Sequence, residues 1–344
     1  MTHKDSPDAP GAAPGDPLHK AAAPAEPVTG DLFPSAQRHP TRTGTARTVI
    51  GTLAALAVVG LGAAWWITRP QVITAAELPN HTPDLANGEL MFFAGGCASC
   101  HAAPGASGEA KKVLAGGLEL PTPFGLFRVP NISPDPNVGI GGWSDAEFVT
   151  AMVKGTSPGG EHLYPAFPYT SYQRMTNEDL LDLKAYLDTL PKSDTHVEGH
   201  ALAFPFGFRP LLGAWKYLYL DGQRFRPDPG ATPQVNRGAY LVKGPGHCGE
   251  CHTPRDALGG MEMNRWLAGG PNPEGHGTVP NITSAPSGLG NWSVDEIANL
   301  LETGFTPEFD SVGGSMGPVI DNWSHVPEKD RDAVGAYLLS LPPH

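Results

Sequence analysis

The sequence predicts a mostly α-helical fold in which one N-terminal membrane-spanning helix precedes two tandem copies of a small helical domain. Three observations support this prediction: a long uncharged run near the N-terminus, motifs that recur in unbroken order, and helix-start signals beside apolar residues at helical spacing. The 344 residues include 43 Gly and 37 Pro, which indicates long loops between the helices. The formal net charge of −12 argues against nucleic acid as a partner.

Residues 1–45 form a segment that is rich in proline and alanine. The segment contains eight Pro and eight Ala and has almost no apolar periodicity. Such a composition cannot bury enough apolar surface to offset the entropy of ordering the chain. We therefore expect a disordered tail on the cytoplasmic side of a membrane.

The next segment, residues 46–69, is predicted to be a transmembrane anchor. Its central run, Val49–Ile67, has 19 residues without a charge. As a helix this run is about 28 Å long, close to the thickness of the hydrocarbon layer. Arginines precede it, and Trp65 and Trp66 lie at its far end, so the positive-inside rule puts residues 70–344 outside the cytoplasm. We expect a single-pass protein of a bacterial inner membrane with its folded part in the periplasm.

The alternative to an uncleaved anchor is a signal peptide. A processing site of small residues follows at Thr74-Ala75-Ala76. The charged region before the apolar run would then be about 48 residues long, far more than a signal peptide normally has. The uncleaved anchor is the better interpretation.

Motifs of the exported part occur twice, with offsets between 149 and 153 residues. This repetition predicts two homologous domains, 78–195 and 228–344, joined by a connector at 196–227. The matching pairs are Thr82-Pro83 and Thr232-Pro233, Cys97 and Cys248, Leu114–Gly117 and Leu267–Gly270, Pro130–Ile132 and Pro280–Ile282, Trp143-Ser144 and Trp292-Ser293, and Ala185–Leu187 and Ala336–Leu338.

Three main helices are expected in each domain. In the first domain they are Pro83–Phe93 after a Thr82 cap, a helix capped by Ser144 and Glu147, and a last helix after Thr176. The counterparts in the second domain begin at Pro233 after Thr232, after Ser293 with Glu296, and near Pro327.

All four cysteines lie in two copies of the pattern Cys-x-x-Cys-His. This pattern is the attachment signature of c-type haem: both sulfurs bond the haem, and the adjacent histidine binds its iron. A thioredoxin-like redox pair would need a βαβ setting, and a zinc site would have to combine motifs 151 residues apart. We therefore predict two class I-like cytochrome c domains, each with one covalently bound haem c and its iron. The residues are Cys97, Cys100 and His101, and Cys248, Cys251 and His252.

The sixth iron ligand is sought among methionines, because a thioether opposite histidine gives the higher potentials used in electron transfer. Met316 lies between the middle and last helices of the second domain. In the first domain the matching loop carries Phe167, and Met175 is the methionine left in that loop. Met175 could instead be a hydrophobic staple before the Thr176 cap, and His162 is the alternative ligand.

Two further features have open interpretations. The repeated Pro-Asn-Ile motifs, 130–132 and 280–282, either line the haem edge or fix the loops. His247, next to Cys248, is expected to be an exposed surface residue. We identify no catalytic residue.

Six stretches of the chain are distinctive: 122–125, 130–135, 139–144, 163–169, 204–215 and 236–242. They resemble the cytochrome c subunits of membrane-bound alcohol, gluconate and sorbitol dehydrogenases. The resemblance implies a relay that takes single electrons from a periplasmic dehydrogenase and passes them towards the respiratory chain, and it implies the ligand pairs His101 with Met175 and His252 with Met316. Those subunits usually carry three haem domains.

The expected function is thus a membrane-anchored dihaem cytochrome c that relays electrons from a periplasmic dehydrogenase or a quinol-linked donor to other cytochromes or an oxidase. One rival is a dihaem enzyme of the peroxidase or thiosulfate oxidoreductase type, which needs an open sixth position at the first haem. Another rival is the haem subunit of a terminal oxidase.

Overall fold

The computed structural model describes residues 43–272 and 277–344. Of the expected disordered tail, residues 1–42 lie outside the described residues, and residues 43–45 belong to a helix. This helix, α1, covers Thr43–Thr68, and it is long and apolar enough to cross a membrane. It starts three residues before the predicted anchor because nothing in 43–45 stops a helix.

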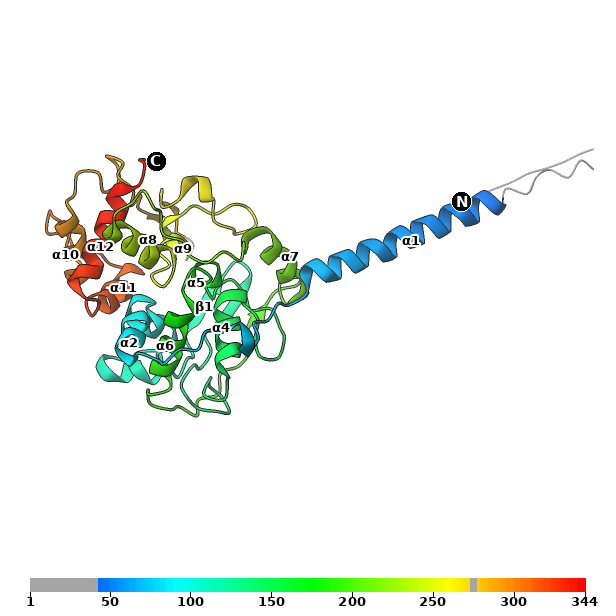
Figure 1. The fold of residues 1–344 in the computed structure, drawn as a ribbon, viewed down its shortest axis with the longest axis horizontal. Helices are drawn as coiled ribbons and strands as arrows, with labels where there is room; N and C mark the ends of the chain where they lie inside the picture. The colour runs from blue at the N-terminus through cyan, green and yellow to red at the C-terminus, as the bar shows by residue number, and fades with distance from the viewer. Residues whose placement is uncertain (1–42, 273–276) are drawn as a thin grey trace, which may run out of the picture. The chain divides into compact units, whose positions relative to one another are not determined.

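The chain divides after Ala57, and residues 58–344 form one compact, mostly helical unit that contains both repeats (Figure 1). The unit is held together by one continuous core, to which both repeats contribute buried apolar side chains.

In the first repeat the elements are the 3₁₀ turn Ala75–Glu77, α2 Leu85–Ala94, α3 Cys97–His101, the 3₁₀ turn Gly108–Val113, β1 Glu119–Thr122, β2 Gly125–Arg128, α4 Asp145–Lys154, α5 Tyr169–Tyr172 and α6 Asn177–Leu187. The connector holds β3 Ala201–Leu202 and α7 Pro210–Tyr219. The second repeat holds α8 Pro233–Lys243, α9 Gly249–His252, the 3₁₀ turn Met263–Arg265, β4 Gly270–Pro271, β5 Thr278–Val279, α10 Val294–Thr303, α11 Met316–Trp323 and α12 Glu328–Ser340.

The predicted caps form at most helix starts. Ser144 begins α4 with a complete capping box, in which its hydroxyl accepts from the Glu147 N–H at 3.3 Å and the Glu147 carboxylate accepts from the Ser144 N–H at 2.8 Å. The same box begins α10. Thr176 and Thr232 cap α6 and α8 as predicted.

The start of α2 was predicted at the wrong residue. The cap is Asp84, not Thr82, and the helix begins at Leu85. The Asp84 carboxylate accepts hydrogen bonds from the N–H groups of Ala86 and Asn87, at 2.9 and 3.2 Å. Because one carboxylate satisfies two of the first N–H groups of the helix, it replaces the threonine two residues earlier.

Each repeat is closed by a tight crossing of its first and last helices, α2 with α6 and α8 with α12 (Figure 1). The crossing points are glycines. A Cβ atom on Gly88 would lie 2.2 Å from the Asp182 carbonyl oxygen, and one on Gly238 would lie 1.8 Å from the Ala333 carbonyl oxygen. Backbone approaches backbone at both points, so no larger residue fits there.

A small three-stranded antiparallel sheet, β1-β2-β3, ties the connector to the first repeat. Its last strand comes from the connector and pairs with β2, where Gly125 faces Leu202. Gly125 has φ 125°, and a Cβ there would lie 2.5 Å from the Ala201 carbonyl oxygen, so the pairing needs glycine. The sequence did not predict this sheet.

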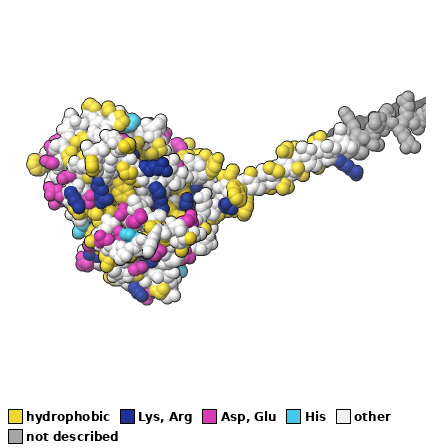
Figure 2. Space-filling view, in the orientation of Figure 1, with side chains coloured by type: hydrophobic (Ala, Val, Ile, Leu, Met, Phe, Trp, Pro, Cys, Tyr) yellow, Lys and Arg dark blue, Asp and Glu magenta, His cyan; other side chains and the backbone are white. Residues whose placement is uncertain are grey.

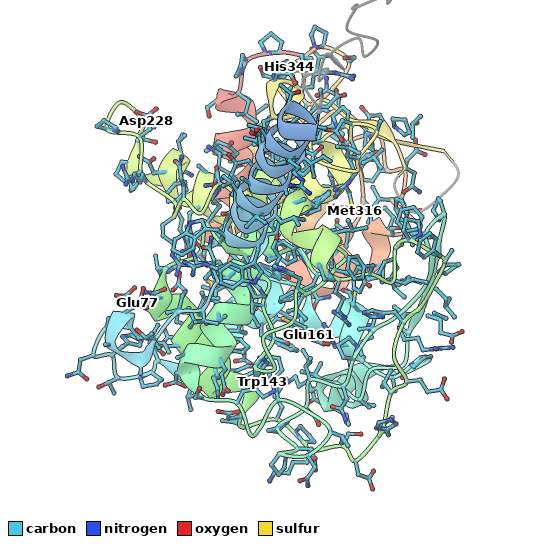
Figure 3. All side chains as sticks on the ribbon, turned by 90° about the vertical axis from the view of Figure 1, so that its right-hand side faces the viewer. Glu77, Trp143, Glu161, Asp228, Met316 and His344 are labelled. Carbon is cyan, nitrogen blue, oxygen red and sulfur yellow. The ribbon has the colours of Figure 1, made fainter. Side chains whose placement is uncertain are left out.

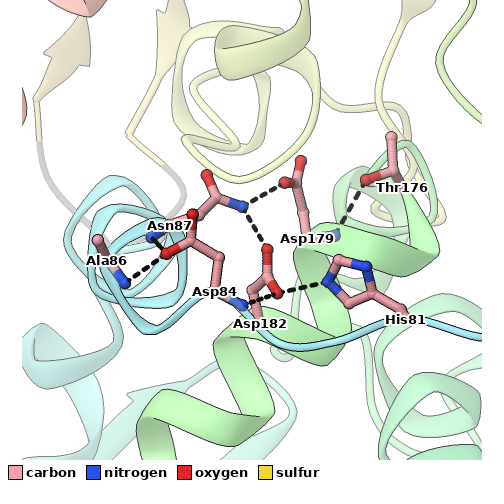
Figure 4. A network of polar contacts seen from close by, with 7 residues as sticks. All are labelled: His81, Asp84, Ala86, Asn87, Thr176, Asp179 and Asp182. Atoms are coloured by element: carbon pink, nitrogen blue, oxygen red, sulfur yellow. Dashed lines mark hydrogen bonds and ion pairs between the residues drawn. The ribbon is translucent and has the colours of Figure 1, made fainter.

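A polar network around the buried Asp182 fastens α2 to α6 (Figure 4). Its centre is Asp182, whose carboxylate contacts His81 Nε2 at 2.6 Å and accepts hydrogen bonds from the Asp84 N–H at 2.7 Å and from Asn87 Nδ2 at 2.8 Å. Asn87 also donates to Asp179 at 2.6 Å. Burial raises the pKa of Asp182, but these hydrogen bonds outweigh burial and hold the pKa below its ordinary 3.8.

We predict that Asp182→Asn lowers the free energy of unfolding by about 1–3 kcal/mol at neutral pH, because the charged acceptor of several donors is lost. A carboxylate whose pKa is lower in the folded state stabilises the protein above its unfolded pKa, and loses this effect as the pH falls through the folded pKa. The difference in the free energy of unfolding between wild type and Asp182→Asn should therefore become smaller below about pH 4. Denaturant unfolding followed by circular dichroism measures both effects. Glu178→Gln, on the exposed side of the same helix, is the control, and an equal loss in both variants would contradict the assigned role.

Candidate haem attachment sites

The first Cys-x-x-Cys-His motif forms the short helix α3. Gly96, with φ 58°, turns the chain directly before it. Helical spacing of three residues puts the sulfurs of Cys97 and Cys100 on one face, and His101 ends the turn. The second motif forms α9 in the same way and is capped by its first cysteine, Cys248.

Both histidines are oriented by the same hydrogen bond. His101 Nδ1 donates to the Pro130 carbonyl, and His252 Nδ1 donates to the Pro280 carbonyl, each at 2.9 Å. A carbonyl oxygen only accepts, so the proton sits on Nδ1 and the lone pair on Nε2. Burial lowers the pKa of both imidazoles and so favours the neutral form. A histidine binds iron as a neutral imidazole through a free nitrogen lone pair, and both histidines offer Nε2 in this form. The two sites therefore fit a haem at each motif.

A glycine loop holds each acceptor carbonyl beside its histidine. The Gly116 N–H donates to the His101 carbonyl at 2.7 Å, and Gly116 has φ 72°. A Cβ on Gly116 would lie 2.5 Å from the carbonyl carbon of Pro130, so only glycine lets the two segments meet. The repeated Leu-Ala-Gly-Gly motif therefore positions the histidine. The second repeat has the equivalent contacts of Gly269 with His252, Pro280 and Asn281.

The asparagines of the Pro-Asn-Ile motifs fix loops. The Asn131 side-chain amide donates to the carbonyls of Ser193 and Thr195 at 2.9 and 3.0 Å. The Asn281 amide donates to the carbonyl of His344, the last residue, at 2.9 Å. Both amide groups are thus used within the protein, which favours loop fixation over a place at the haem edge.

The two candidate methionine ligands have different surroundings. Met316 begins α11 and is half-buried against the core (Figure 3). Met175 is 1% exposed, and its N–H donates to the Tyr172 carbonyl at 3.0 Å. In the second repeat Val326, also 1% exposed, makes the same bond to Trp323. Met175 therefore occupies a position that holds a valine in the other repeat, directly before the last helix.

His162, the alternative sixth ligand, is engaged on both sides of its ring. It is 5% exposed, its Nε2 donates to the Thr68 carbonyl at 2.8 Å, and its Nδ1 accepts from Lys216 Nζ at 3.0 Å. Both ring nitrogens are thus engaged within the protein, which favours a structural role for His162 over iron ligation. Lys216 comes from the connector, 54 residues later, and no local pattern predicts this contact.

The attachment segments of the two repeats contact each other's repeat. Ser99, between the cysteines of the first motif, accepts from Asn322 at 2.9 Å. Glu250, at the same place in the second motif, accepts from the hydroxyls of Thr170 and Ser171 at 2.6 and 2.8 Å. Asn322 directly precedes Trp323, the last residue of α11, and Ser171 directly precedes Tyr172, the last residue of α5. The contacts are thus reciprocal, as in an interface between parts related by a two-fold axis.

His247 belongs to this contact region, and the expectation that it is a surface residue was wrong. It is half-buried, its Nε2 donates to the Gly95 carbonyl at 3.3 Å, and its ring meets that of Tyr172 edge-on at 5.6 Å. His325 of the second repeat also stacks on Phe93 of the first, at 4.3 Å. Partners that lie so far apart in the sequence leave no local pattern, which is why sequence analysis missed them.

Comparison with known proteins agrees with this geometry. The cytochrome c family model matches residues 85–191. A dihaem c-type cytochrome of Cereibacter sphaeroides is 53% identical over 84% of this chain and 96% of its own length. The cytochrome c subunit of the quinone-type alcohol dehydrogenase of Gluconacetobacter polyoxogenes is 38% identical over 76% of this chain and 58% of its own length. The cytochrome c subunit of gluconate 2-dehydrogenase of Pantoea cypripedii is 34% identical over 74% of this chain and 58% of its own length.

These relatives confirm the predicted resemblance to dehydrogenase cytochrome subunits, although the chain spans only about three fifths of the length of the alcohol and gluconate dehydrogenase subunits. The match to the dihaem relative covers nearly all of that protein and includes both attachment motifs of this chain. The chain therefore belongs to the cytochrome c family and carries two covalently bound haem c groups.

Proposed function

We propose that this protein is a membrane-anchored dihaem electron carrier that accepts single electrons from a periplasmic dehydrogenase, or from a quinol-linked donor, and passes them towards the respiratory chain. The observation that carries this proposal is the reciprocal contact of the two attachment segments, Ser99 with Asn322 and Glu250 with Ser171. A relay needs two one-electron centres held at a fixed distance and orientation. The hydrogen bonds of each attachment helix to α11 or α5 of the other repeat, one partly buried and one buried, supply that constraint.

The proposal includes two tandem class I-like domains, 78–195 and 228–344. Support comes from features that both repeats share: the glycine helix crossings, the capping boxes of the middle helices, and the histidine-to-proline hydrogen bonds. Features that recur at matching positions are the structural mark of a duplicated domain.

In each domain the cysteines would form thioethers with the haem, and the adjacent histidine would bind the iron through Nε2. The bound haem supplies an iron that cycles between the ferric and ferrous states. The chain's own part is to hold each imidazole neutral and fixed, through the Pro130 and Pro280 carbonyls. Met316 and Met175 are the proposed sixth ligands, and a filled sixth position favours electron transfer over catalysis at the iron.

Helix α1 is the proposed single-pass anchor, with the haem domains in the periplasm. Its 26 residues are long enough to span a bilayer, and Trp65 and Trp66 would lie at the periplasmic interface. The proposed donor follows from the relatives whose names describe cytochrome subunits of dehydrogenases.

Purification of the full chain from native membranes tests this function. We expect a dehydrogenase subunit to co-purify, and we expect the substrate of that enzyme to reduce both haems, seen as two ferrous α-bands in the absorbance spectrum. A preparation without a dehydrogenase that turns over peroxide or thiosulfate would favour the enzyme class instead. The control is the same preparation without substrate, in which the haems should stay oxidised.

The charge of the exported part predicts a salt-dependent partner. Residues 70–344 contain 17 Lys and Arg against 30 Asp and Glu, a net charge of −13. Basic soluble cytochromes should be attracted to this surface, and the attraction weakens as ions screen it, over about 10 Å at 0.1 M salt. We expect the bimolecular electron-transfer rate to fall as ionic strength rises. A rate that does not change between low and high salt would rule out electrostatic docking.

A further inference from the structure

The connector helix α7 is amphipathic with its faces reversed. Its outward side carries Leu211, Tyr217 and Leu218, which are 50%, 68% and 60% exposed. Its inward side carries Gly213 and the charged Lys216, which is 8% exposed. A surface helix normally turns its charged residues to water and its apolar residues inward. The reversed pattern indicates that the outward side of α7 does not face water.

Residues 201–220 contain two charged side chains, Arg209 and Lys216, and both are held by contacts within the protein. Lys216 Nζ donates to the carbonyls of Lys154, at 2.8 Å, and of Gly155. Arg209 donates to the His162 carbonyl at 2.7 Å and lies over the Tyr164 ring, 4.9 Å from its centre. The Arg209 side chain stays 32% exposed, and its Nε lies 3.8 Å from the Glu161 carboxylate. The outer surface of this segment therefore carries no unpaired charge.

The loop before α7 extends the apolar surface. Phe204, Phe206 and Phe208 are 95%, 43% and 59% exposed. Phe206 also meets Phe124, itself 44% exposed, at 4.9 Å. Exposed apolar side chains are common singly, but a contiguous group marks an interaction site. We define the connector patch as Phe204, Phe206, Phe208, Leu211, Tyr217 and Leu218.

Helix α7, whose outward side carries part of the connector patch, lies against the end of helix α1 through its inward side. A Cβ on Gly213 would lie 2.2 Å from the Thr68 carbonyl oxygen, so α7 packs directly on the last residue of α1 (Figure 1). His162 fixes the same carbonyl at 2.8 Å. Trp65 and Trp66, one turn earlier, are 65% and 61% exposed. Figure 2 shows hydrophobic side chains gathered at this end of the folded unit.

We propose that the connector patch lies in the outer interfacial layer of the lipid bilayer, as a second membrane contact beside α1. The inference rests on the proposed anchor, because Thr68 marks the bilayer surface only if α1 spans the membrane. Phenylalanine, tyrosine and leucine without an unpaired charge among them are residues that enter the boundary between headgroups and acyl chains. Two contacts hold the haem domains at a fixed height and orientation, whereas a single helix would leave them free to tumble.

Site-specific photocrosslinking in vesicles tests the proposal. The full-length holoprotein, with a benzophenone side chain at Leu211 or at Leu218, is reconstituted into phosphatidylethanolamine and phosphatidylglycerol vesicles and irradiated. Lipid adducts are counted by mass spectrometry. The matched control is Phe309 of the second repeat, which is 86% exposed and lies outside the connector patch. We expect severalfold more lipid adduct at both patch positions than at Phe309.

A label inside α1 distinguishes failure of the proposed anchor from failure of the proposed lipid contact of the connector patch. Leu61 is 72% exposed and reports on the anchor alone. Lipid adducts at Leu61 without adducts at the patch positions would overturn the second contact and leave the anchor in place. Adducts at neither would overturn both. In native membranes, patch crosslinks to a dehydrogenase in place of lipid would assign the patch to a protein partner and overturn the lipid contact. The exposed positions tolerate the bulky label, and the haem spectrum of each variant verifies its fold.

Discussion

Alanine in place of Met316 is expected to open the sixth position of the second haem. Reduced wild-type protein, with both irons six-coordinate, should not react with carbon monoxide. Reduced Met316→Ala should bind carbon monoxide at one haem, and the potential of that haem should fall by on the order of 0.1 V, a small part of the roughly 0.8 V range that axial ligands control. The physical reason is that the thioether stabilises ferrous iron. Carbon monoxide difference spectra and a redox titration measure the two effects.

Met175 gives the corresponding test for the first haem, and a second variant separates its two candidate roles. Met175→Leu keeps an apolar side chain in the core but removes the sulfur, whereas Met175→Ala removes both. A ligand role predicts carbon monoxide binding in both variants. A packing role, which the equivalent Val326 suggests, predicts an unchanged first haem in Met175→Leu and lower stability in Met175→Ala. Met152→Leu, another buried methionine of that repeat, is the control.

Carbon monoxide binding by the wild type has a different meaning. Rapid binding at the first haem would show an open iron without any substitution. It would favour the enzyme class over the relay, because an enzyme that reacts with peroxide needs such a position.

Gly238→Ala is expected to disrupt the second repeat. The new Cβ would lie 1.8 Å from the Ala333 carbonyl oxygen and 2.8 Å from the Tyr337 Cβ, so α8 and α12 would have to move apart. The atoms that the new Cβ meets first belong to the backbone and cannot rotate away as a flexible side chain could. We therefore expect the free energy of unfolding to fall by about 3 kcal/mol or more. Denaturant unfolding of the holoprotein, followed by far-ultraviolet circular dichroism, measures the loss.

The control is a glycine in open space. Gly199 has no heavy atom within 4 Å of an added Cβ, so Gly199→Ala should change the stability by less than about 1 kcal/mol. Gly88→Ala, at the crossing of α2 and α6, should behave like Gly238→Ala. If Gly238→Ala were as stable as Gly199→Ala, the helix crossing would not be the closing contact of the repeat.

Features with local causes could be predicted from the sequence. The capping boxes at Ser144 and Ser293, and the caps at Thr176 and Thr232, are confirmed because a cap and its N–H partner lie within three residues of each other. The attachment motifs belong to the same class, because the chemistry depends on the spacing within five residues. The long apolar helix α1 follows from composition alone.

The start of α2 shows where local reasoning failed. Thr82 and Asp84 are both good caps, and nothing near them in the sequence decides between them. Asp84 caps the helix, while its N–H donates to Asp182 on α6, almost a hundred residues later. The choice is made by packing of the last helix against the first.

The roles of His162, His247 and Glu250 were also decided by tertiary structure. Each residue has its main partner in another part of the fold: Lys216 of the connector, Gly95 of the first repeat, and the hydroxyls of α5. The sequence by itself determined the candidate residues for haem attachment and where most helices begin, because those interactions act over one helical turn. Only the tertiary structure decided how the repeats face each other and which side of α7 faces outward, because buried polar groups take whichever partner the folded chain brings within hydrogen-bond distance.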